Sequence, residues 1–306
     1  MREYYPEGWI SETGENKRNM LTPSALALAQ VNETVLEAVV LMCDAEHNLT
    51  INLGCMMGII PRNEGAIGIS EGTTRDIALI SRVGRPVCFV VTAIKTDKNG
   101  KLYALLSRRR AQELCRQSLL NRCHIGDIID AKITHLESFG AFCDIGCGII
   151  ALLPIDAISV SRISHPKDRF KTGDNIRVVL KDIAPDGKIT LSHKELLGTW
   201  EENAASFTPG QTVSGVIRSI EEYGVFVELT PNLAGLAEPR QDVFIGQQAS
   251  VYIKSVIPEK MKIKLIIIDS FNSVYNPEIR YFYTDDKIKE WEYSPSLCRK
   301  KICSNF

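Results

Sequence analysis

Two short stretches of the sequence each carry a pair of aromatic residues that encloses a glycine and a small residue. Phe139 and Phe142 form the pair in "ESFGAFCDIG", and Tyr223 and Phe226 form the pair in "EEYGVFVELT". Exposed aromatic rings can stack on nucleic-acid bases with little sequence preference, which contributes about 1–3 kcal/mol per base. An isolated aromatic pair more commonly belongs to a hydrophobic core. Because this pair recurs where aliphatic residues already fill the core positions, the repetition favours a binding surface.

The spacing within each pair needs an explanation, because residues three apart on a regular strand point to opposite faces. A glycine between them permits a bulge or a sharp twist that redirects the following side chains. We therefore expect a strand in which the glycine turns both rings toward the outer face.

An internal repeat surrounds the two pairs, and it decides the fold class. "GDIIDAKITHLESFGAFCDI" aligns with "GQTVSGVIRSIEEYGVFVEL", so that Gly140 falls on Gly224 and Leu152 on Leu236. Further along, "GDNIRVVLKDIAPDGKITLS" aligns with "GQQASVYIKSVIPEKMKIKL", with Lys181 over Lys254. The second copy is shorter between these stretches, which is typical of a loop that differs in length between strands.

Each copy contains about five short segments with the alternating polarity of half-buried strands, as in Ile129, Ala131 and Ile133. Five strands in roughly 70 residues, without long helices, predict a small, partly open antiparallel barrel of the oligonucleotide-binding (OB) type. An earlier and weaker copy is visible from "LEAVVLMCDAEHNLTINLGCMMGIIP" to "KLYALLS", but it has no aromatic pair. We expect this degenerate barrel to dock protein or to pack against its neighbour rather than to bind bases.

The predicted fold class is therefore all-β, with three tandem five-stranded OB-fold barrels joined by short helical linkers. The expected domains are an N-terminal segment with a short helix (1–34), a degenerate barrel (35–110), a helical linker (111–123), a barrel with the first aromatic pair (124–196), a linker (197–208), a barrel with the second aromatic pair (209–270) and an aromatic, basic tail (271–306).

The bulk composition fits a soluble globular protein. The chain has 306 residues, with 44% hydrophobic and 24% charged residues and a formal net charge of -1. This balance excludes a histone-like polycation but not nucleic-acid binding, which depends on where the charges lie. The nine cysteines lack the spacing of a disulfide framework. No secretion signal or apolar segment of roughly 20 residues is visible, so we expect a cytoplasmic protein that is not bound to a membrane.

Together these motifs resemble the RNA-binding domain family named after ribosomal protein S-one. The resemblance rests on the spacing of the glycines, aliphatic residues and aromatic pair, followed by "ALLP" or "GLAE" and then by "HPKDRFKTGD" and "GKITLS". It covers roughly residues 35 to 270. It implies five-stranded barrels that bind single-stranded RNA, including messenger RNA, at the small ribosomal subunit.

The resemblance also implies which residues form the RNA face. It assigns both aromatic pairs to that face. It adds Lys188 from the barrel with the first pair and Lys262 from the barrel with the second pair. The chain departs from the family where a histidine and an acidic residue are usual: Pro154 and Ala184 stand there in one barrel, and Glu238 and Pro258 in the other. A carboxylate at Glu238 would repel phosphates.

Basic residues near the expected faces would supply contacts to phosphates. The candidates are Lys132, Arg177, Lys181 and Lys188 in one barrel and Arg218, Lys254, Lys262 and Lys264 in the other, with His135 beside the first pair. Any one of these side chains could equally be ordinary solvated surface. Two weak sites on a short linker would still bind RNA together more strongly than either alone.

Other chemically suggestive residues have simpler explanations. The basic cluster "SRRRAQ" at 107–112 is either the start of a helix with a solvated face or a contact for RNA or the ribosome. Cys143 and Cys147 lack the spacing of a zinc site, and the five histidines have no nucleophile motif near them. We therefore expect no metal, no cofactor and no catalytic residues.

Three functions remain open. The first is a non-enzymatic RNA-binding protein of the translation apparatus, with single-stranded RNA and the small ribosomal subunit as partners. The second is a regulatory protein-docking module whose barrels no longer bind RNA strongly. The third is an RNA-processing enzyme, but such enzymes attach this barrel to a separate catalytic domain and no such domain fits in the chain. The sequence does not predict the oligomeric state.

Overall fold

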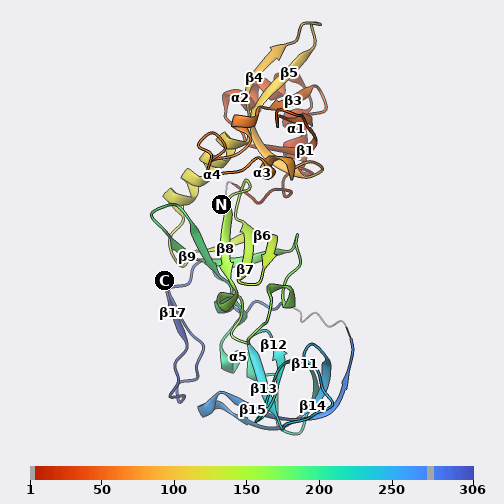
Figure 1. Ribbon diagram of the computed structural model, residues 1–306. Helices are drawn as coiled ribbons and strands as arrows, with labels where there is room; N and C mark the ends of the chain where they lie inside the picture. The colour runs from red at the N-terminus through yellow and green to blue at the C-terminus, as the bar shows by residue number, and fades with distance from the viewer. Residues whose placement is uncertain (1–3, 274–278) are drawn as a thin grey trace. The chain divides into compact units, whose positions relative to one another are not determined.

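The computed structural model describes residues 4–273 and 279–306 (Figure 1). The chain divides into two compact units, residues 1–123 with 144–150 and residues 124–143 with 151–306. The three predicted five-stranded barrels are confirmed. We expected partly open barrels, but all three close, because the third and last strands of each pair in parallel.

The first barrel closes in the strand order β1-β2-β3-β5-β4. Its strands are β1 (Leu36–Cys43), β2 (Leu49–Asn52), β3 (Met57–Ile60), β4 (Pro86–Thr96) and β5 (Leu102–Ser107), with a short helix α3 (Ile77–Ile80) between β3 and β4. Two helices precede it, α1 (Gly14–Met20) and α2 (Pro23–Val31). Thr22 caps α2, since its side chain accepts a hydrogen bond from the Ala25 amide.

Helix α4 (Arg108–Arg122) follows the first barrel, and its three leading arginines are all ion-paired. Arg108 is buried against Glu7, Arg109 pairs with Glu64, and Arg110 pairs with Glu33. Ser107 caps the helix. The basic cluster is thus the start of a helix, but its arginines bind carboxylates within the first unit instead of forming a solvated basic face.

The second and third barrels have the same topology as the first. The strands of the second are β6 (Ile128–Glu137), β7 (Gly140–Asp144), β8 (Ile150–Pro154), β9 (Asn175–Ile183) and β10 (Ile189–Ser192). Those of the third are β11 (Thr212–Glu221), β12 (Gly224–Thr230), β13 (Leu233–Ala237), β14 (Gln248–Ile257) and β15 (Lys262–Phe271). Helix α5 (Trp200–Ala204) lies between them.

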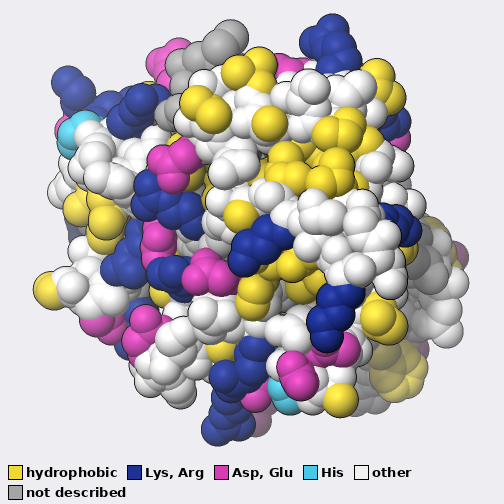
Figure 2. Space-filling model, turned by 90° about the horizontal axis from the view of Figure 1, so that it is seen from above, with side chains coloured by type: hydrophobic (Ala, Val, Ile, Leu, Met, Phe, Trp, Pro, Cys, Tyr) yellow, Lys and Arg dark blue, Asp and Glu magenta, His cyan; other side chains and the backbone are white. Residues whose placement is uncertain are grey.

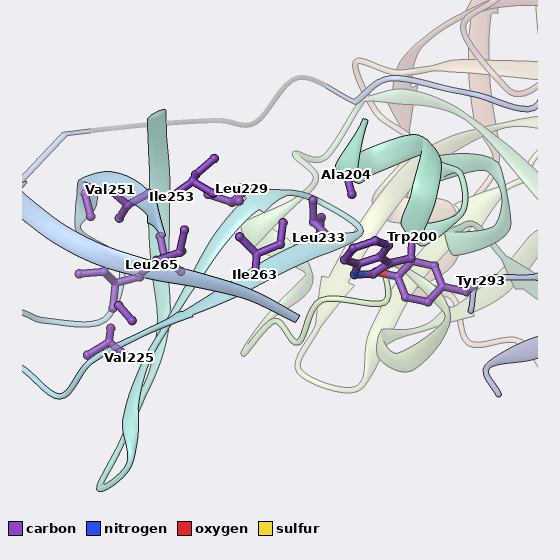
Figure 3. Close-up of a cluster of buried hydrophobic side chains, with 14 of the residues drawn as sticks. Trp200, Ala204, Val225, Leu229, Leu233, Val251, Ile253, Ile263, Leu265 and Tyr293 are labelled. Atoms are coloured by element: carbon purple, nitrogen blue, oxygen red, sulfur yellow. The ribbon is translucent and has the colours of Figure 1, made fainter. Parts of the chain in front are cut away.

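The third barrel shares one hydrophobic core with residues outside it. Inward-facing aliphatic residues such as Val225 and Leu265 fill the barrel, and Trp200 of α5 and Tyr293 of the tail extend the same cluster (Figure 3). A buried ion pair also joins the second barrel to the third, since Arg169 binds Glu228 of β12. The second and third barrels are therefore parts of one packed unit.

The C-terminal tail, expected only to be aromatic and basic, is a structural element. Its two short strands, β16 (Glu290–Glu292) and β17 (Cys303–Asn305), form their own sheet. Trp291 and Tyr293 are buried, and the Trp200 amide donates to the Tyr293 carbonyl oxygen at 2.9 Å. The tail therefore holds the second unit together. Because it matches no repeat, the sequence did not predict this role.

His193 contacts the tail from inside the second unit. Its Nδ1 lies 2.9 Å from the Ile158 carbonyl oxygen and its Nε2 lies 3.3 Å from the Tyr281 hydroxyl. A neutral ring can donate from Nδ1 and accept the tyrosine proton at Nε2. Burial lowers the pKa of His193 to about 4.

Acidification should destabilise the second unit through His193. Between pH 6.5 and about 4, the unfolded chain protonates this histidine and the folded chain does not, so stability is lost as the pH falls through this window. From pH 7 to pH 5 we expect a loss of about 2 kcal/mol, measured by urea denaturation followed by tryptophan fluorescence. His193→Asn should remove most of this pH dependence. An unchanged slope in that variant would exclude His193 as its source.

Candidate nucleic-acid interface

The two aromatic pairs lie on the surface with nearly the same geometry. The ring centroids of Phe139 and Phe142 are 6.0 Å apart at an interplanar angle of 88°. Those of Tyr223 and Phe226 are 6.1 Å apart at 89°. In each pair the first ring is the more exposed, 55% for Phe139 and 65% for Tyr223. Perpendicular rings offer faces in different directions, so each pair can hold two bases at an angle to one another.

The reason both rings reach the surface differs from our expectation. Phe139 and Tyr223 lie in the two-residue turns before β7 and β12, and only Phe142 and Phe226 lie on the strands. The rule that residues three apart face opposite ways on a strand therefore does not apply. In the third barrel the register shift lies in β11, between Ile217 and Ser219, not at the glycine.

The glycine within each pair allows close contact between strands. A Cβ atom added to Gly140 would lie 2.5 Å from the Leu153 carbonyl oxygen. A Cβ atom on Gly224 would lie 2.4 Å from the Ala237 carbonyl oxygen. These contacts are too short for any side chain, so the glycine keeps the turn aromatic close to the neighbouring strand.

A row of paired residues crosses the third barrel from its aromatic pair. Phe226 of β12 pairs with Leu236 of β13, and Leu236 pairs with Lys264 of β15. Side chains paired across adjacent strands lie on the same face about 5 Å apart. This row places an aromatic ring, an apolar floor and an exposed ammonium group in line, as a base and its phosphate require. Lys262 lies two residues before Lys264 and is also exposed.

In the second barrel, His135 joins the aromatic pair. Its ring stacks at 6.4 Å from the Phe142 ring, and its Nε2 lies 2.6 Å from the Glu137 carboxylate. Thr190 of β10 pairs with Leu152 of β8, so this position of the row carries a hydroxyl where the third barrel has Lys264. Lys188 is exposed in the turn before β10, where it pairs with Asp186 at 2.6 Å.

Two arginines among the predicted phosphate contacts are bound elsewhere in the protein. The Arg177 guanidinium donates to the carbonyl oxygens of Tyr283 and Asp285 in the tail, both at 3.1 Å. Arg218 is only 12% exposed and pairs with Glu228 and Asp168. We therefore remove both from the interface, because their charges already stabilise the fold.

The remaining candidates lie on other strands. Lys132 is half-buried on β6, and Lys181 is exposed on β9. Lys254 is exposed on β14 and lies 3.5 Å from Glu238, the carboxylate that the sequence placed near RNA. The structure thus brings His135 to the first aromatic pair and Lys264 into line with the second.

Reasoning from the sequence missed Leu236 and the Arg169–Glu228 ion pair. The alignment of Leu152 with Leu236 was the available signal for the apolar floor. No sequence pattern near Glu228 predicts its burial. Glu228 lies two residues after Phe226 on the same strand, and it is buried because Arg169 approaches from another barrel.

Comparison with known proteins agrees with this geometry. A family model described as the S1 RNA binding domain matches residues 123–194. The second barrel is an S1 RNA binding domain. This match confirms the resemblance found in the motifs.

The wider chain is similar to bacterial ribosomal proteins. It is 29% identical over 194 residues to the small ribosomal subunit protein bS1 homolog of Bacillus subtilis, covering 61% of this chain and 48% of that one. It is 27% identical over 253 residues to the small ribosomal subunit protein bS1 of Staphylococcus epidermidis, covering 77% of this chain and 62% of that one. The chain therefore spans between about half and two thirds of these relatives.

Among solved structures, the chain is similar to a multidomain protein with nucleic acid binding domains from Streptococcus pneumoniae TIGR4. The identity is 15% and the TM-score 0.25, with 79% of this chain and 76% of that chain covered. Within the described residues, no helix is long and apolar enough to span a membrane. Over the same residues, no group of three or more His, Cys, Asp or Glu side chains is arranged to hold a metal ion.

Proposed function

We propose that this chain is a non-enzymatic protein that binds single-stranded RNA through its second and third barrels. The observation that carries the proposal is the repeated exposed aromatic pair, once inside an S1 RNA binding domain and once at the same place in the next barrel. Bases stack on the rings, and nearby lysines contact the phosphates. The proposed RNA-binding residues are Phe139, Phe142, His135, Lys188, Tyr223, Phe226, Lys262 and Lys264, with Lys132, Lys181 and Lys254 as further phosphate contacts.

Similarity to proteins named small ribosomal subunit protein bS1 supports a place in translation. We propose that the chain acts in the cytoplasm and binds messenger RNA at the small ribosomal subunit. In this proposal residues 124–196 and 209–270 are the RNA-binding domains, and residues 35–110 form the barrel that does not bind bases.

The distribution of surface charge favours a modest electrostatic contribution to RNA binding, made by a few residues. Basic and acidic side chains are interspersed on the face shown in Figure 2, in keeping with the net charge of -1. Binding must then come from stacking together with a few lysines. Because the two barrels belong to one packed unit, RNA bound to one is held near the other, which raises the overall affinity.

Salt titration tests this proposal. For a single strand, log K falls with log[salt] with a slope of about −0.7 per phosphate neutralised, so four lysine contacts give a slope near −3. We therefore expect the affinity for oligouridylate to fall about fiftyfold between 50 and 200 mM salt. Affinity that does not change with salt, or no detectable binding at 50 mM, would contradict the proposal.

A protein-docking role is the second candidate, and the first barrel favours it. The turn between β1 and β2, Asp44 to Asn48, carries no aromatic pair, and β1 exposes the aliphatic side chains of Val39 and Leu41. Contacts of this kind depend little on salt, so the same titration separates the two functions.

A further inference from the structure

The third barrel exposes a mixed apolar and basic surface away from its aromatic pair. We call it the back face and define it by Thr212 of β11, Tyr252 and Lys254 of β14, and Ile266 and Ile268 of β15 (Figure 1). Tyr252 pairs with both Thr212 and Ile266, so these three side chains form one row. The exposed fractions are 37% for Tyr252, 36% for Ile266 and 56% for Ile268.

The corresponding face of the second barrel is covered. There Ile128 pairs with Val179, and Val179 pairs with Ser192, which is the same row in the repeat. Val179 and Ser192 are completely buried. The same row of side chains is therefore buried in the second barrel and exposed in the third.

Two elements cover this face in the second barrel, the short 3-10 helix Lys194–Leu197, whose Glu195 accepts a hydrogen bond from Ser192, and an extended stretch of the tail. The Ile128 amide donates to the Asp286 carbonyl oxygen at 2.8 Å, and the Ile288 amide donates to the Gly126 carbonyl oxygen at 2.8 Å. Tyr281 and Tyr283 pack against the shared core. The segment 281–286, "YFYTDD", thus contacts the second barrel through the side chains of Tyr281 and Tyr283 and through backbone carbonyl oxygens.

The charges around the back face favour a partner that is acidic. Lys262 and Lys264 precede Ile266 on the same side of β15, and Lys254 follows Tyr252 by two residues on β14; all three lysines are exposed. Two copies of the back face placed together would bring lysines close to lysines, which is unfavourable. A second copy of this chain is therefore a poor occupant.

RNA bases are also poor occupants of the apolar part of this face, Tyr252, Ile266 and Ile268. The aromatic pair lies at β12, which is separated from β14 by β11 on one side and by β13 and β15 on the other. A strand of RNA stacked on Tyr223 and Phe226 would have to wrap around the closed barrel to reach Tyr252. The exposed isoleucines offer aliphatic surface, which suits protein side chains better than base stacking.

We propose that the back face of the third barrel binds an extended polypeptide segment of another protein, rich in aromatic and acidic residues, as residues 281–286 bind the second barrel. Its aromatic side chains pack on Tyr252, Ile266 and Ile268, and its carboxylates face Lys254 and Lys264. Lys254 and Lys264 are also proposed phosphate contacts, so the segment competes with RNA for these two lysines but not for the aromatic pair.

The test uses the full-length chain with its isoleucine methyl groups labelled for NMR. The probe is the blocked peptide YFYTDD, added to about 1 mM. We expect the methyl signals of Ile266 and Ile268 to shift, whereas the exposed Ile77 in the first unit stays unchanged. Tyr252→Ser should lower the affinity for the peptide at least fivefold. Phe244→Ala, which truncates an exposed ring elsewhere in this barrel, should leave that affinity unaltered. Replacing both aspartates of the peptide by asparagine should also lower the affinity of the peptide for the back face.

Three results would overturn the proposal. The first is no shift of the Ile266 and Ile268 signals with the peptide. The second is a shift of these signals on addition of oligouridylate, which would make the face part of the RNA site. The third is a concentration-dependent dimer, seen by light scattering, that Tyr252→Ser dissolves. Loss of RNA binding by itself would leave these outcomes unaffected.

Discussion

Truncating both aromatic pairs to alanine should weaken the binding of single-stranded RNA by at least about thirtyfold. Stacking contributes roughly 1–3 kcal/mol per base, so the loss of only one base at each pair costs about 2 kcal/mol or more. Fluorescence anisotropy with a labelled oligouridylate measures this directly. Truncation of one pair, Phe139→Ala with Phe142→Ala, should give a smaller loss, because the third barrel still holds the strand.

Phe244→Ala supplies a matched control for the ring truncations. Phe244 is 67% exposed on the third barrel but lies outside both pairs. Its truncation removes the same kind of surface without removing a platform, so the affinity should stay within twofold of the parent. If the four-residue variant, still folded by circular dichroism, also stayed within twofold, stacking on these rings would be excluded.

Removal of Arg169 should destabilise the second unit by about 3 kcal/mol. The Arg169 side chain is fully buried, and it pairs with Glu228, of which only 1% is exposed. Arg169→Met leaves that carboxylate buried with Arg218 as its remaining ion-pair partner, and breaking a buried pair from one side typically costs 3–5 kcal/mol. Urea denaturation monitored by tryptophan fluorescence in a Trp9→Phe background reports this unit, because Trp200 and Trp291 lie within it and Trp9 lies in the first unit.

Two further variants make the Arg169 prediction specific. Arg169→Met combined with Glu228→Gln should recover part of the loss, since no buried charge is then left without its partner. Asp242→Asn removes an exposed partner of Arg240 and should change the stability by less than about 1 kcal/mol. If Arg169→Met were no more destabilising than Asp242→Asn, the buried pair would not be what joins the second and third barrels.

The strands were predictable because the alternation of polar and apolar residues is a local signal and the same pattern recurs in each repeat. Alternation in Ile129, Ala131 and Ile133 marks a half-buried strand without knowledge of its partner. The repeat then shows that the same five strands recur, and a residue such as Leu236 takes its role from Leu152. The turn position of Phe139 was missed, because strand ends depend on how far neighbouring strands pair.

The roles of several charged residues could not be predicted, because they depend on contacts between distant parts of the chain. Glu228 and Asp144 both lie two residues after the second aromatic of a pair, where alternation suggests a solvated side chain. Both are about 2% exposed in the structure. Arg169 comes from the second barrel to bury Glu228, and the Glu7 amide donates to Asp144 at 2.8 Å. No pattern within one strand encodes such a partner.

The position of the tail could not be predicted for the same reason, since it too depends on contacts between distant residues. Residues 279–306 match no repeat, and their aromatic and basic composition fits either a free tail or a docked one. The docked state depends on particular contacts, such as the Arg177 guanidinium with the Tyr283 carbonyl oxygen and the Tyr281 hydroxyl with the Arg177 amide. The sequence around Arg177 predicts a phosphate contact, but the guanidinium of Arg177 donates to carbonyl oxygens of the tail instead.

Photo-crosslinking with a 4-thiouridine oligonucleotide, followed by mass spectrometry of the crosslinked peptides, tests the central claim most directly. RNA held on both platforms should crosslink within residues 139–142 and 223–226. Crosslinking should be lost at each pair when that pair is truncated to alanine. Crosslinks confined to the first barrel or to β14, with none at either pair, would contradict the account.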